Sequence, residues 1–136
     1  MNEWGTTMWR TILGILVGLV AWVLVVSLIN RGLRLWLPGY VTAEPLLQFT
    51  LAMKIARLSM AAITSLVAGM AVRAVAPQTR LAPWIVGLVT LALFLPWHIQ
   101  HWNMFPVWYH LSFLVPLVPL VVLGAALFPQ RKSREA

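Results

Sequence analysis

The chain contains no cysteine and no aspartate, and its three acidic residues are all glutamates. Without cysteine it forms no disulfide, thiolate metal site or iron–sulfur cluster, and it has no cysteine nucleophile. The sequence also contains no paired carboxylates, no nucleophile elbow and no phosphate-binding glycine loop. We therefore expect a protein that is not an enzyme.

Charge is scarce as well, because 10% of the 136 residues are charged while 61% are hydrophobic. A water-soluble domain needs far more charge to cover its surface. The net charge is +7, but the cations lie mostly at the ends of apolar runs and form no patch of the kind that binds nucleic acid. We expect a protein whose partners are the lipid bilayer and its anionic headgroups, with no nucleic acid.

Four apolar stretches are each long enough to cross a bilayer as a helix. They run from about 11 to 29, 49 to 72, 81 to 99 and 108 to 128. The connection over 30–48 mixes arginine, leucine and tryptophan, as in segments that lie in the headgroup region, and a polar tail follows over 129–136. The sequence predicts an all-α fold, an integral membrane four-helix antiparallel bundle that forms a single domain over 1–136.

The cations also favour one orientation. Arg73 and Arg80 flank the second connection and three more cations lie in the tail, whereas the third connection has none. The positive-inside rule then places both termini in the cytoplasm, although Arg31 and Arg34 in the first connection oppose this. A signal peptide is the alternative for the first stretch, but no small-residue cleavage site follows it.

Small residues at spacings of four mark two predicted helix faces. Gly14 and Gly18 form a pair on the first helix, and Ala61, Ser65 and Gly69 form a longer series on the second. Such spacing lets two backbones approach closely in lipid. We expect these residues to pack the first helix against the second, and association between two copies of the chain is the alternative.

The second predicted helix carries two cations, Lys54 and Arg57, on the same arc as its small and polar residues. Ile55 and Ile63 lie on the opposite side and should face lipid. The two cations either anchor the helix by reaching the headgroups or line a basic recess. Such a recess would hold an anionic lipid headgroup or a quinone carbonyl, with Glu44 as a counter-ion.

Three histidines gather near one predicted end of the bundle. His98 and His101 share a face at the end of the third helix, and His110 begins the fourth. They either bind one metal ion or act as interfacial hydrogen-bonding groups. Haem suits them less, because haem ligation in a bundle needs histidines on facing helices at membrane depth. We expect no cofactor, and we keep a metal or haem as the alternative.

Tryptophan is abundant, and seven of the eight residues lie near predicted helix ends, as in interfacial belts. The exception is Trp22, near the middle of the first helix. Three of the others surround the histidines: Trp97, Trp102 and Trp108. We predict that they rim a polar recess between the second, third and fourth helices, floored by Phe94.

A resemblance that covers about the final third of the chain is carried by two segments, Trp97-His98-Ile99-Gln100-His101-Trp102 and Phe105-Pro106-Val107-Trp108-Tyr109-His110-Leu111-Ser112-Phe113-Leu114. They resemble the last helical hairpin of small uncharacterised bacterial inner-membrane proteins. The resemblance implies the bacterial cytoplasmic membrane as the location, and it implies no activity and no catalytic residue.

Two classes of function remain. One is a non-enzymatic membrane protein that acts by association with a membrane complex, with lipid or with its own copies. The other is a small redox or metal-handling module that uses the three histidines, or a protein that binds a quinone or anionic lipid in the recess.

Overall fold

The computed structural model describes residues 3–129, and their side chains from Gly5 onward. Of the predicted tail over 129–136, only Pro129 lies within the described residues, and the side chain of Trp4 lies outside them. The described chain is helical and contains no strand, which confirms the all-α prediction. Its elements are α1 (Glu3–Trp36), α2 (Tyr40–Leu46), α3 (Leu51–Val75), α4 (Leu81–Gln100), the 3-10 turn η1 (Trp102–Met104) and α5 (Val107–Leu127).

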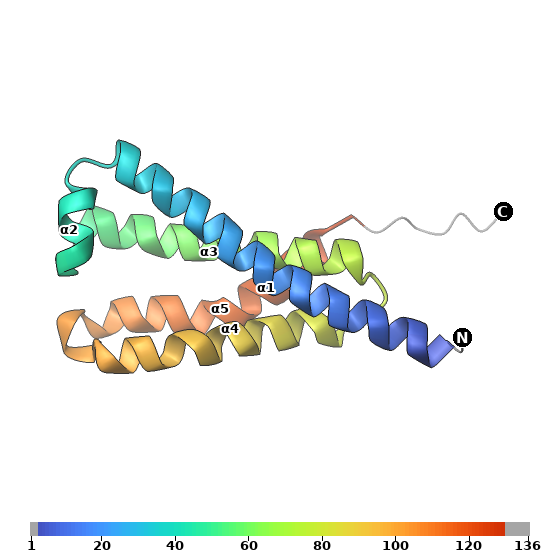
Figure 1. Cartoon of the computed structure of the whole chain (residues 1–136). Coiled ribbons are helices and arrows are strands. Elements are labelled where there is room, and N and C mark those ends of the chain that lie inside the picture. Colours follow the sequence, from blue (N-terminus) through green and yellow to red (C-terminus); the bar gives the residue numbers. More distant parts are fainter. Residues whose placement is uncertain (1–2, 130–136) are drawn as a thin grey trace.

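The four long helices, α1, α3, α4 and α5, are each long and apolar enough to cross a membrane. They run antiparallel, with α2 and η1 at one end and the N-terminus at the other, and α1 crosses the other helices obliquely (Figure 1). Many large apolar side chains on these helices face outward. In lipid such exposure carries no hydrophobic penalty, which explains how so apolar a chain folds into so thin a bundle.

The first long helix and the connection after it differ from the prediction. We predicted that the first span ends near Ile29, whereas α1 continues to Trp36. It stops where Pro38 disfavours helical geometry in the preceding residue and Gly39 takes a left-handed conformation at φ 81°. The connection is therefore shorter than predicted and contains a short helix, α2, folded back against the bundle.

Neighbours in the bundle do not follow chain order. The helix α3 packs chiefly on α5 and α1, and α4 packs on α5 and α1, while the consecutive helices α3 and α4 touch only slightly. The closest approach is between α3 and α5. A Cβ added at Gly69 would overlap the carbonyl oxygen of Val121, and one added at Gly124 would overlap that of Leu66. Two backbones meet there without side chains between them.

The small residues of α1 pack inside the chain, as predicted. A Cβ at Gly14 would lie 2.8 Å from Cβ of Ala76, and one at Gly18 would overlap the Val72 side chain. The prediction was wrong for Gly69, which faces α5 and not α1. The reason is that the small face of α3 spans an arc wide enough to serve two neighbours.

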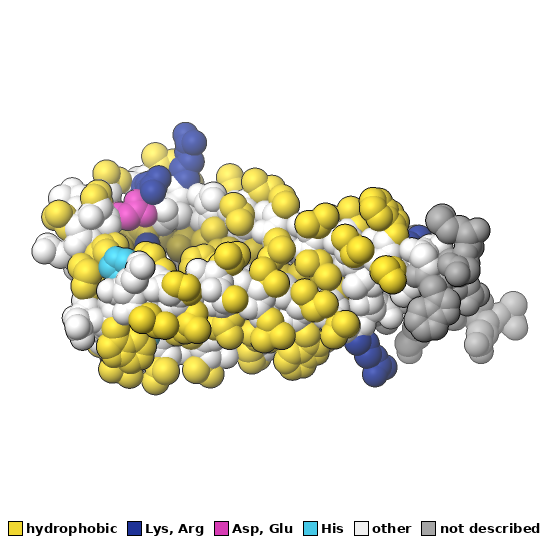
Figure 2. Space-filling model, turned by 60° about the horizontal axis from the view of Figure 1, so that its bottom comes forward, with side chains coloured by type: hydrophobic (Ala, Val, Ile, Leu, Met, Phe, Trp, Pro, Cys, Tyr) yellow, Lys and Arg dark blue, Asp and Glu magenta, His cyan; other side chains and the backbone are white. Residues whose placement is uncertain are grey.

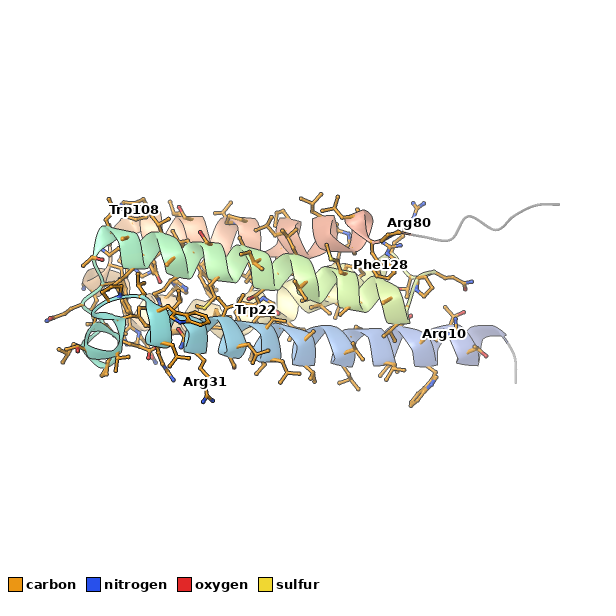
Figure 3. All side chains as sticks on the ribbon, turned by 90° about the horizontal axis from the view of Figure 1, so that it is seen from above. Arg10, Trp22, Arg31, Arg80, Trp108 and Phe128 are labelled. Atoms are coloured by element: carbon orange, nitrogen blue, oxygen red, sulfur yellow. The ribbon has the colours of Figure 1, made fainter. Side chains whose placement is uncertain are left out.

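The polar arc of α3 turns inward, as predicted. Its buried residues include Ala61, Thr64 and Ser65, whereas Ile55 and Ile63 are about half exposed. Trp22, midway along α1 (Figure 3), is also buried and donates from Nε1 to Ser65 Oγ at 3.2 Å. A hydrogen bond at this depth satisfies two groups that lipid could not.

Candidate functional site

A cavity of about 430 Å³ lies at the end of the bundle that carries α2. Figure 2 shows a hollow at this end, with acidic, basic and histidine side chains beside it. The segment from α2 to the start of α3 and the helices α3, α4 and α5 all contribute to its wall. The lining residues are Glu44, Leu47, Arg57, Leu93, Phe94, Trp97, His98, Tyr109 and Phe113.

Arg57 is the cation of this cavity, and two phenols hold it in place. Its Nε donates to the hydroxyl of Tyr109 at 3.0 Å, and Nη1 donates to that of Tyr40 at 2.7 Å. The guanidinium lies over the ring of Phe49, 4.5 Å from its centroid. Among the side chains described, from Gly5 to Pro129, no carboxylate bonds to Arg57. Because phenols are neutral partners, these hydrogen bonds leave the charge of Arg57 unneutralised.

Glu44 lines the cavity, but its carboxylate forms an ion pair with Arg34. Both carboxylate oxygens accept hydrogen bonds, one from Arg34 Nε at 2.6 Å and one from Asn30 Nδ2 at 2.8 Å. Burial raises the pKa of Glu44, but the hydrogen bonds from Arg34 and Asn30 outweigh it and leave the pKa below its ordinary value. The predicted counter-ion of Arg57 is thus committed to Arg34.

Tyr40 connects Arg57 to this carboxylate. Its hydroxyl accepts from Arg57 and donates to Asn30 Oδ1 at 2.6 Å. Burial raises the pKa of the Tyr40 hydroxyl, and the nearby Arg57 charge only partly offsets this. The neutral phenol therefore links Arg57 in the cavity to Asn30 on α1, and Asn30 in turn bonds to Glu44 on α2.

His98 and His110 form a buried pair, with their Nδ1 atoms 2.8 Å apart. Nε2 of His110 lies 3.1 Å from the carbonyl oxygen of Trp102. Because a carbonyl only accepts, the partners assign the proton of His110 to Nε2. With both rings neutral, His98 then donates from Nδ1 to His110. Only His98 of this pair lines the cavity.

His101 stands apart from this pair. Its Nδ1 is 2.8 Å from the carbonyl oxygen of Trp97, and its ring stacks on the Trp97 indole at 4.5 Å. Across the described part of the chain, no three His, Asp or Glu side chains are grouped so that they could hold a metal ion. The structure brings together two of the three predicted metal ligands, because His101 bonds back to its own helix.

Of the other residues predicted for the site, some line the cavity and some lie outside it. Phe94 and Trp97 line the cavity, whereas Lys54, Trp102 and Trp108 do not. Trp102 instead stacks on His110 at 4.5 Å, and Trp108 lies edge-on to Tyr109 at 6.3 Å. The two tryptophans thus support residues of the site from outside and do not form its rim.

Sequence reasoning missed the two phenols that hold Arg57. The chain has only two tyrosines. Tyr40 follows Pro38 in the first connection, and Tyr109 lies in the first turn of the last helix. A signal was available, since both positions lie at the same predicted end of the bundle as Arg57. Their meeting at one guanidinium, however, depends on α2 folding back, which no local pattern indicated.

Comparison with known proteins found no matching family model, no matching curated protein and no matching solved structure. Fold and site together define a helical membrane bundle with a cavity near one end that is lined by Arg57, Glu44 and His98.

Proposed function

We propose that this protein acts by association and not by catalysis, and that it binds the polar head of an amphiphile dissolved in the membrane. The head presents an oxygen acceptor, either neutral or anionic, and sits in the cavity against Arg57. The observation that carries the proposal is the state of Arg57. Its described hydrogen-bond partners are two neutral phenols, and its Nη2 bonds to neither. A guanidinium with open hydrogens in an apolar wall gains from a ligand oxygen that accepts from it, whether that oxygen is neutral or anionic.

The apolar lining supports an amphiphile over a water-soluble ion. Leu93, at the wall of the cavity, is 68% exposed on a helix that faces lipid. Most of the remaining wall is made of apolar and aromatic side chains around a few polar groups, which is the usual composition of a site for an organic ligand. An amphiphile therefore reaches the cavity sideways from the bilayer, with its tail left in lipid.

The test compares two substitutions one turn apart on α3. In Arg57→Gln the guanidinium is lost from the cavity, and in Lys54→Gln an equal charge is lost outside it. Each protein is purified in mild detergent, and its bound lipids are quantified by mass spectrometry. We expect Arg57→Gln to lose a specific species about tenfold, as removal of one charge-assisted hydrogen bond would do, while Lys54→Gln retains it.

Two results would contradict the proposal: an unchanged lipid complement in Arg57→Gln, or an equal loss in Lys54→Gln. Because Arg57 also holds Tyr40 and Tyr109, a second variant reaches the site without disturbing them. Leu93→Trp adds bulk at the exposed wall and should displace the same species.

We further propose the bacterial cytoplasmic membrane as the location, with both termini in the cytoplasm. The uncharged connection around η1 and the cations Arg73 and Arg80 at the opposite end support this orientation. The exposed residues Asn103 and Gln78 lie at these two ends. Because the chain has no cysteine, Asn103→Cys should react with an impermeant thiol reagent in intact cells and Gln78→Cys should not. The reverse pattern would invert the orientation and place the cavity on the cytoplasmic side.

A further inference from the structure

We infer that the head bound in this cavity is a hydroxyaryl group of the quinol class, held at one oxygen by Arg57 and Tyr109 and at the other by His98. This inference rests on the proposed function and names the ligand for the same site. It follows from which hydrogen-bonding positions the protein leaves open toward the cavity, and from what surrounds them.

The first open position is a pair of donors. Arg57 uses Nε and Nη1 on the two phenols, so its Nη2 hydrogens remain available. The hydroxyl of Tyr109 accepts from Arg57, and its own proton has no acceptor within the described residues. Both side chains line the cavity. They together suit one oxygen with two free lone pairs, such as that of a carbonyl, phenol or phenolate.

The second open position is an acceptor. The carbonyl of Trp102 fixes the proton of His110 on Nε2, and His110 then accepts at Nδ1 from His98. Neutral His98 is left with its lone pair on Nε2, which has no partner among residues 3–129. His98 lines the cavity, and we assign this Nε2 lone pair to a ligand that donates. A hydroxyl supplies the proton, whereas a second carbonyl would be repelled.

The third observation is the shape of the wall. Four aromatic side chains face the cavity, those of Phe94, Trp97, Tyr109 and Phe113. Aromatic faces and edges pack best against another flat ring. The volume of about 430 Å³ accommodates a single substituted ring, with its tail leaving past Leu93. A phosphomonoester lipid also offers an acceptor oxygen for Arg57 and a hydroxyl that could donate to His98. Its compact tetrahedral head, however, would leave these aromatic surfaces uncovered.

The experiment measures binding of three probes to the purified full-length protein in micelles by anaerobic equilibrium dialysis. The probes are decylubiquinol, decylubiquinone and dioleoyl phosphatidic acid. We expect the quinol to bind about tenfold more tightly than the quinone, the difference of about one buried hydrogen bond. The quinol should also bind more tightly than phosphatidic acid.

His98→Leu should remove the preference for quinol over quinone, because the acceptor is lost. His98→Gln should restore part of it, since an amide oxygen accepts at a similar place, and this variant separates loss of the acceptor from loss of the fold. His101→Leu is the matched control, since His101 lies outside the cavity, and it should leave the preference unchanged.

Equal affinity for quinone and quinol, or a preference that survives His98→Leu, would overturn the inference. Tighter binding of phosphatidic acid would also overturn it and leave the proposed function in place. If instead Arg57→Gln keeps the full lipid complement and neither ring compound binds, the proposed function fails together with the inference.

Discussion

Replacing Gly69 with alanine is expected to lower the free energy of unfolding by about 3 kcal/mol, the upper end of the usual effect of overpacking. The new methyl group would overlap the carbonyl oxygen of Val121 and would lie 2.7 Å from the backbone nitrogen of Ala125. Neither atom belongs to a side chain that could rotate away. The helices α3 and α5 must therefore separate, and they form the most extensive contact of the bundle.

Gly32 provides the matched control, because it undergoes the same chemical change in another long helix. A Cβ at Gly32 would meet only the ring of Trp36, at an ordinary 3.7 Å. Alanine there should stabilise α1 by about 0.5–1 kcal/mol, since glycine is a poor helix former. Denaturant unfolding in mixed micelles, followed by circular dichroism, measures both variants. Equal stability of the two would mean that α3 and α5 do not approach as closely as described.

Replacing Phe105 with alanine is expected to destabilise the protein by about 3–5 kcal/mol, as for other large aromatic residues removed from a core. Phe105 is 5% exposed and packs on Tyr109, Trp97 and Phe49, with ring centroids 4.9, 5.8 and 6.0 Å away. It lies between η1 and α5, where it joins the end of α4 to the start of α3. Its loss leaves the phenol of Tyr109 without its stacking partner.

This substitution should also weaken the site, because Tyr109 positions Arg57. The neighbouring Met104 is 53% exposed and serves as control. Met104→Ala should change stability by less than about 0.5 kcal/mol. Unfolding is followed as for the glycine variants, and ligand retention is measured beside it. A Phe105→Ala protein as stable as Met104→Ala would show that the aromatic cluster at this end does not hold the helices together.

The sequence by itself determined the fold class and the boundaries of two of the four long helices. In lipid a long uncharged run satisfies all its backbone hydrogen bonds within itself as a helix, and α4 and α5 begin and end within one residue of the predicted limits. The spacing of small residues on α3 likewise predicted which of its faces is buried, because the helical period alone decides which residues share a face. Arg57 and His98 were identified as site residues because a cation and a histidine are unusual in such helices.

Only the tertiary structure decided which of these residues share a site. From the sequence, His101 was as good a candidate for the site as His98, because both are histidines at the end of the same helix. In the structure, however, His101 bonds back to the carbonyl of Trp97. Lys54 likewise lies outside the cavity that Arg57 enters. Tyr40 reaches Arg57 because α1 runs on to Trp36 and α2 then turns back, which depends on Gly39 and on packing against Phe49. Helical period and hydropathy act between near neighbours in sequence, whereas hydrogen-bond partners over 17 and 52 residues are selected by the packing of whole helices.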